Sequence, residues 1–185
     1  MISKYMIATN AQKVINFLLM NPDRPFFERE IARRTGISYG SANKVLNQLY
    51  KDGILQKKSE GRINYYSIDL SGPYIREIKI LNNLLAIEPL IVKLKPVAFK
   101  IVLYGSWASG TDRENSDIDL FIVSSSGGEV SAIAGRFADK INKKIQAIVR
   151  TPLEMMKPGK NDEVFLKQVE QGKVLWEKEP DENNV

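Results

Sequence analysis

The sequence of residues 104–120 is YGSWASGTDRENSDIDL, and it joins two short apolar runs, residues 99–104 and 118–123. Runs of this length and composition are typical of buried strands. Gly105 permits a close approach of the backbone to a ligand. Free backbone N–H groups at the start of a helix, together with the Ser106 hydroxyl, can donate to phosphate oxygens. Asp117 and Asp119 are two positions apart, so they point to the same side of a strand and can share one or two divalent cations that bind a nucleotide's phosphates.

Strand-like and helix-like segments continue to alternate after this stretch. The apolar spacing predicts a helix over 129–142, a strand over 145–149 and short helices over 152–156 and 162–171, and residues 174–176 can close the core. The segment from residue 96 to residue 178 is therefore expected to be one domain of strands and helices.

Residues 104–111 and 115–120 match, in order and spacing, the signature of nucleotidyltransferases of the DNA polymerase beta type, and the domain resembles the minimal form of that family. The resemblance implies a small mixed sheet backed by helices. It also implies that Asp117 and Asp119 are the catalytic residues and bind Mg²⁺. A nucleoside triphosphate is the implied ligand or substrate, with Gly105, Ser106 and Ser109 as its binding residues.

The chain departs from this family in two respects. The third carboxylate of the family belongs on the strand 145–149, where the matching residue is Gln146, and active members commonly have a basic residue after the glycine, where residues 106–112 have none. Loss of one general base typically lowers a rate by about 10²–10⁴ but does not abolish binding. Three hypotheses follow: an active transferase, a nucleotide- or metal-binding domain with weak or lost catalysis, which we favour, and a structural relic.

Three helices and a basic hairpin are predicted before this domain. The spacing of apolar residues indicates helices over 11–20, 27–35 and 38–51 and strands over 54–58 and 63–68, with a turn at 59–62. Residues 55–68 resemble the wing of bacterial and archaeal winged-helix regulators. The resemblance implies that residues 1–72 form a winged helix-turn-helix domain, and the whole chain is then an α+β protein of two domains.

The third helix and the hairpin are the predicted interface with double-stranded DNA. Polar side chains that can contact base edges or phosphates follow the outer face of the helix, and basic side chains follow the hairpin: Tyr39, Ser41, Asn43 and Lys44, then Lys57, Lys58 and Arg62. Residues 1–72 contain eleven Lys and Arg against six Asp and Glu, so they carry the whole net charge of +5. The alternative is a winged helix that is used only for protein contacts.

Residues 73–95 are predicted to be an apolar helical connector. Pro73 can begin a helix, and Pro89 is expected to end or kink it, because the residue before a proline is pushed out of helical geometry. Apolar residues from Leu84 to Leu94 keep near-heptad spacing, so the connector is expected to pack against the C-terminal domain or against a second subunit in a homodimer. Residues 179–185 are expected to be a flexible tail.

The composition excludes several kinds of chemistry. The chain has no cysteine and no histidine, so disulfides, thiolate ligands and imidazole catalysis are excluded. No secretory signal pattern and no membrane-spanning apolar stretch are found, so a cytoplasmic location is expected. The predicted function is a DNA-binding transcriptional regulator. The alternative is an active Mg²⁺-dependent transferase that modifies a partner protein or RNA, and the resemblance implies a helical toxin-like protein as a partner.

Overall fold

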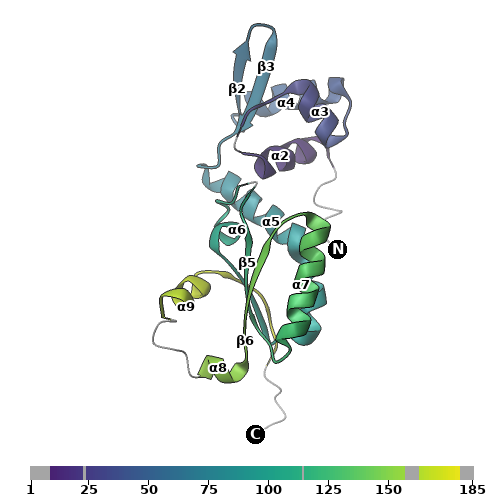
Figure 1. The fold of residues 1–185 in the computed structure, drawn as a ribbon. Helices are drawn as coiled ribbons and strands as arrows, with labels where there is room; N and C mark the ends of the chain where they lie inside the picture. Colours follow the sequence, from purple (N-terminus) through teal and green to yellow (C-terminus); the bar gives the residue numbers. More distant parts are fainter. Residues whose placement is uncertain (1–8, 23, 114, 157–162, 180–185) are drawn as a thin grey trace. The chain divides into compact units, whose positions relative to one another are not determined.

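The computed structural model describes residues 9–22, 24–113, 115–156 and 163–179 of the chain, which is drawn in Figure 1. The chain divides into two compact units, Met1–Leu85 and Ala86–Val185. The predicted tail lies outside the described residues from residue 180 onward.

In its described residues up to Ile68, the first unit has three helices and a three-stranded sheet of order β1-β3-β2. Its elements are α2 (Asn10–Met20), β1 (Phe26–Phe27), α3 (Glu28–Thr35), α4 (Tyr39–Lys51), β2 (Leu55–Glu60) and β3 (Ile63–Ile68). The predicted helices and strands are confirmed within a few residues at each end, and only β1 was not predicted. The hairpin turn is shorter than predicted, because the pairing of β2 with β3 continues to Glu60 and Ile63.

Side chains and one glycine define where these helices begin and end. The hydroxyl of Thr9 accepts the backbone N–H of Gln12 at 3.2 Å, and the Gln12 side chain accepts the N–H of Thr9 in return, which is a capping box. At the start of α4, the hydroxyl of Ser38 accepts the backbone N–H of Ser41. Helix α3 ends at Gly36, whose φ of 68° is a left-handed conformation that glycine adopts without steric strain.

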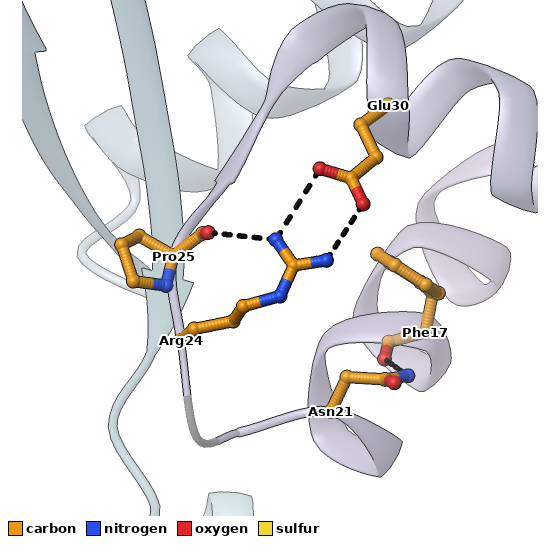
Figure 2. A network of polar contacts seen from close by, with 5 residues as sticks. All are labelled: Phe17, Asn21, Arg24, Pro25 and Glu30. Carbon is orange, nitrogen blue, oxygen red and sulfur yellow. Dashed lines mark hydrogen bonds and ion pairs between the residues drawn. The ribbon is translucent and has the colours of Figure 1, made fainter.

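The connection between α2 and α3 is held by polar contacts, which Figure 2 shows. Asn21 Nδ2 donates to the carbonyl of Phe17 at 2.8 Å at the end of α2. The guanidinium of Arg24 makes two hydrogen bonds to Glu30, of 2.7 and 3.3 Å, and lies 3.8 Å from the centre of the Phe26 ring. Glu30 belongs to α3, and its carboxylate is therefore bound by Arg24 of the loop that joins α2 to α3.

Helix α5 (Pro73–Leu94) continues through Pro89, so the end predicted at this proline is wrong. Proline has no N–H to donate to the carbonyl four residues earlier. Ile87, Leu90 and Ile91 around it are buried, and we infer that their packing offsets the missing hydrogen bond. The division between the two compact units falls inside this helix, between Leu85 and Ala86.

The second unit is a four-stranded mixed sheet with helices on its faces. After the short helix η1 (Lys95–Val97), its elements are β4 (Lys100–Tyr104), α6 (Gly105–Ser109), β5 (Ile118–Val123), α7 (Gly127–Ile141), β6 (Ile145–Arg150), α8 (Pro152–Met156), α9 (Glu163–Glu170) and β7 (Lys173–Glu177). The strand order is β6-β5-β4-β7; β5 and β6 are parallel, and the other pairs are antiparallel. The predicted mixed sheet is confirmed.

The two faces of this sheet are covered by different helices (Figure 1). On one face Val102, Tyr104 and Phe121 pack with Val169 of α9 and with residues of α8. Helix α7 lies along β6 on the other side in the view, with Val130, Ala134 and Phe137 buried. The two central strands β4 and β5 are therefore buried on both faces, and only their ends are available for a site. Within the described residues, no helix has the length and apolar character needed to cross a membrane.

Candidate functional site

The end of β4 brings Gly105 directly against Asp119. Antiparallel pairing of β4 with β5 sets Tyr104 opposite Asp119, and Gly105 follows with a φ of +70°. A Cβ atom at Gly105 would lie 2.5 Å from Asp119 Oδ2. Glycine is therefore required here for two reasons, the left-handed backbone and the absence of room for a side chain.

Asp117 and Asp119 lie beside Gln146 of β6. The parallel register pairs Asp119 with Gln146, and the Gln146 amide donates to Asp117 Oδ2 at 2.6 Å. Lys144 Nζ lies 2.8 Å from the same oxygen. Among the described residues, no group of three or more acidic, histidine or cysteine side chains is placed to hold a metal ion. Gln146 thus stands on the strand where the third carboxylate was expected, and its amide binds one of the two acids.

The two carboxyl groups differ in their pKa values. The hydrogen bond from Lys144, with that from Gln146, lowers the pKa of Asp117. Burial raises the pKa of Asp119, and the negative charge of Asp117 adds to this shift. Asp119 is therefore the carboxylate that gains more from a bound cation, since no described lysine forms an ion pair with it.

The donor set fits one Mg²⁺ ion better than two. Asp117 directly precedes β5 and Asp119 is its second residue, and both lie beside Gln146. Mg²⁺ in phosphate-binding sites usually takes one or two carboxylates, with phosphate and water completing the shell. Lys144 must release Asp117 for such binding; its side chain is 67% exposed, so it can move. A second cation lacks its acidic ligand, because Gln146 is neutral.

A cleft of about 390 Å³ opens beside Gly105. It is lined by Gly105, Ala108, Ser109, Gln168, Gln171 and Gly172. Ser109 Oγ lies 3.2 Å from the carbonyls of Gly105 and Ser106, to either of which it can donate, and 2.9 Å from the Thr111 hydroxyl. Helix α6 has only five residues, and its contribution to binding a negative charge is correspondingly small.

Gln168 and Gln171 were not predicted as site residues. Gln168 lies in α9 and Gln171 comes directly after it. This helix meets β4 only in the folded domain, and nothing in the local sequence marks the two glutamines. Ser106, which was predicted, is half-buried and is not among the residues that line the cleft. The cleft therefore has an amide-rich wall that the local motif does not reveal.

In the first unit, two of the predicted DNA-binding residues donate hydrogen bonds to Glu28. Tyr39 Oη donates to Glu28 Oε2 at 2.7 Å, and Asn43 Nδ2 donates to the same oxygen at 3.2 Å. Glu28 itself is only 8% exposed. Tyr39 remains 50% exposed and Asn43 is half-buried. Both residues therefore stay at the surface of α4, while a buried carboxylate on α3 accepts hydrogen bonds from their side chains.

The other predicted residues of this surface differ in their surroundings. Lys44 and Arg62 are exposed and form no ion pair with another described residue. Lys58 pairs with Glu60 at 2.8 Å, and Lys57 Nζ lies 5.7 Å from the rings of Tyr50 and Tyr66. The backbone N–H of Ser41 donates to the Ser38 hydroxyl at 3.2 Å. Among the predicted cations, Lys44 on α4 and Arg62 at the hairpin turn are thus the ones without a ring contact or ion pair inside the described part of the protein.

A Gly-Ser loop after a strand, an acidic pair on the neighbouring strand and a mixed sheet define the second unit as a nucleotidyltransferase-type domain. The model of the family described as Polymerase beta, Nucleotidyltransferase matches residues 86–181, and the chain belongs to this family. No curated protein matches the chain.

Two solved structures that resemble parts of this chain are a toxin-antitoxin structure and a DNA-binding protein. A structure described as the toxin-antitoxin with AMP-PNP is 24% identical, with a TM-score of 0.39, over 52% of this chain and 75% of that chain. Sso10a-2, a DNA-binding protein from Sulfolobus solfataricus, is 27% identical, with a TM-score of 0.32, over 46% of this chain and 95% of that chain. Both TM-scores are low, and the assignment to the family rests on the family match alone.

Proposed function

We propose that this chain is a DNA-binding transcriptional regulator whose nucleotidyltransferase domain binds a nucleoside triphosphate and has weak or no transfer activity. One observation carries this proposal: Gly105 lines a cleft and follows Tyr104, which pairs with Asp119 across the sheet, while the third acidic position is Gln146. In this proposal the residues that bind the nucleotide are present, and the third carboxylate, which would act in catalysis, is absent.

The residues of this site have separable roles in the proposal. Gly105 lets the backbone at the start of α6 approach a phosphate group, and Ser106 and Ser109 offer hydroxyl groups from the same helix. Asp117 and Asp119 hold Mg²⁺, which supplies positive charge beside the triphosphate. Gln146 cannot accept a proton, so an attacking hydroxyl has no base at this position. Ligand binding with slow or absent chemistry follows from this set of groups.

We infer that the first unit is a winged helix that binds double-stranded DNA. The order of three helices and a hairpin is that of the winged-helix fold, and the net positive charge of the sequence lies in residues 1–72. Lys44 and Arg62 are exposed cations on the two elements that such a fold presents to DNA. Their contacts would neutralise phosphates and give binding that weakens as salt rises.

The nucleotide-binding proposal is tested with Gly105→Ala. The added methyl group collides with Asp119, so we expect the affinity for labelled ATP with Mg²⁺ to fall at least about tenfold. Gly53→Ala is the matched control, since Gly53 has a similar φ of +72° but open space around it. Equal affinity of Gly105→Ala and wild type, or no ATP binding by wild type, would contradict the proposal.

The second candidate function is an active Mg²⁺-dependent transferase that modifies RNA or a partner protein, for example a helical toxin-like protein. Membership of the nucleotidyltransferase family is the observation that favours it. Transfer of labelled nucleotide by wild type to RNA or protein acceptors, lost in Asp119→Asn, would establish this function in place of the first.

A further inference from the structure

A single buried carboxylate, that of Glu28, joins α4 to the β2–β3 hairpin. Glu28 is the first residue of α3. Its Oε2 accepts from Tyr39 and Asn43 of α4, at 2.7 and 3.2 Å. Its Oε1 accepts from Tyr66 and Asn64 of β3, at 3.2 and 3.4 Å. Two elements that are distant in the sequence are thus bound to the same charged group.

These four bonds use the full acceptor capacity of the carboxylate. An ionised carboxylate has about four lone-pair sites, and four donors from within the first unit surround this one. The Tyr66 hydroxyl has a second acceptor within reach, Asn47 Oδ1 at 3.4 Å. Burial by itself raises the pKa of Glu28, but the hydrogen bonds from its four donors outweigh this effect and leave the pKa below its ordinary value. The group is therefore ionised at neutral pH and has no free site for an outside ligand.

Further side chains extend the network along both elements. Asn47 Nδ2 donates to Asn43 Oδ1 at 3.1 Å, and Ser59 Oγ of β2 donates to Asn64 Oδ1 at 2.8 Å. A cleft of about 310 Å³ lies next to Glu28, and Arg29 and Arg62 are among its lining residues. Arg62 of the hairpin and Tyr39 of α4 therefore line the same cleft as Glu28.

We propose that Glu28 is a positioning residue for DNA recognition, which fixes the base-contacting face of α4 relative to the hairpin without touching DNA. This inference rests on the proposed DNA-binding function. With Glu28 in place, Tyr39 and Asn43 hold one orientation, and Lys44 and Arg62 are presented to the same duplex at a fixed spacing. In the absence of Glu28, the two cations are still present, but the side chains of Tyr39 and Asn43 no longer hold one orientation.

The test compares Glu28→Gln with wild type on duplex DNA selected from a random pool by wild type. Glutamine has one acceptor oxygen and one donor group, so two of the four donors lose their acceptor. We expect the preference for the selected duplex over a scrambled duplex to fall about tenfold, the low end of the contribution of one good base contact. The salt dependence of binding to the scrambled duplex should not change, because the phosphate-contacting cations are intact.

Glu30→Gln is the matched control, since Glu30 lies two positions away on α3 and binds Arg24 instead of α4 (Figure 2). It should keep the full preference. Tyr39→Phe removes one donor and keeps Glu28, and we expect an intermediate loss that does not add to that of Glu28→Gln in the double variant. If Glu28→Gln does not fold, the single variant Tyr39→Phe tests the inference in its place.

Three outcomes would overturn the inference. The first is full sequence preference in folded Glu28→Gln, and the second is full preference in Tyr39→Phe. The third is a wild type that binds all duplexes equally. A wild type that binds no duplex at low salt would instead refute the proposed DNA-binding function itself.

Discussion

Glu28 is also a residue whose ionisation should affect the stability of the first unit. Burial raises the pKa of its carboxyl, but the four hydrogen bonds lower it by more. A group with a lower pKa in the folded state contributes stability above its unfolded pKa, here 4.5, and this contribution is lost as the pH falls through the folded pKa. We expect the melting temperature to fall over this acidic range.

Glu28→Gln should lower the free energy of unfolding by about 1–3 kcal/mol at neutral pH, because buried donors lose their acceptor. It should also reduce the acid-induced fall in melting temperature, which thermal unfolding at several pH values would measure. Glu170→Gln, an exposed site in the second unit, is the control. A Glu28→Gln variant as stable as wild type at neutral pH would show that the network contributes nothing.

Gln146 is the residue on which the proposed loss of catalysis depends. Gln146→Asp restores an acid beside Asp119, and we expect Mg²⁺-dependent nucleotide transfer to rise at least about tenfold. Gln146→Asn changes the side-chain length without adding a charge and should not raise transfer. Equal transfer by the Asp and Asn variants would mean that the third position is not what limits the reaction.

At the scale of elements, α4 and the hairpin are expected to bind phosphates independently of sequence. Lys44→Ala and Arg62→Ala should each weaken binding to every duplex and reduce the slope of log affinity against log salt by about one. Fluorescence anisotropy over a range of salt concentrations measures this slope. Lys140→Ala, which removes a cation from α7, is the control, and an unchanged slope in both test variants would exclude these two contacts.

The sequence was sufficient to predict the elements that have local signals. Helix spacing, caps and the Gly36 turn are encoded within a few residues, and so is the Gly105 loop between two apolar strands. These predictions succeeded because each depends on neighbours in the chain.

The rest of the two sites depends on contacts between distant segments. Tyr39 and Asn43 have the periodicity of an outward helix face, and only folding brings Glu28 of α3 within hydrogen-bond distance. The contact of Lys144 with Asp117 and the contribution of Gln168 to the cleft arise in the same way. The helix end expected at Pro89 was wrong, because burial of its neighbours outweighs the local preference of proline.

At the scale of the whole molecule, we propose a homodimer that uses α5. Tyr74, Ile78 and Leu81 are 82%, 40% and 40% exposed, and their spacing places them on one face of the helix. Light scattering during size-exclusion chromatography should give the mass of a dimer for wild type and of a monomer for the double variant Ile78→Lys, Leu81→Lys. Glu77→Lys, at an exposed neighbour, should remain dimeric. A monomeric wild type would contradict this assignment.

The central claim is that the nucleotidyltransferase domain keeps nucleotide binding while its catalysis is weak or lost. The most direct measurement follows ATP labelled at the α-phosphate, incubated with wild type, Mg²⁺ and cellular RNA and protein as acceptors, and determines both bound and covalently transferred label. We predict saturable binding that Gly105→Ala removes, with transfer by wild type far below that of Gln146→Asp. Absence of saturable binding, or efficient transfer by wild type that Gln146→Asp does not increase, would contradict the claim.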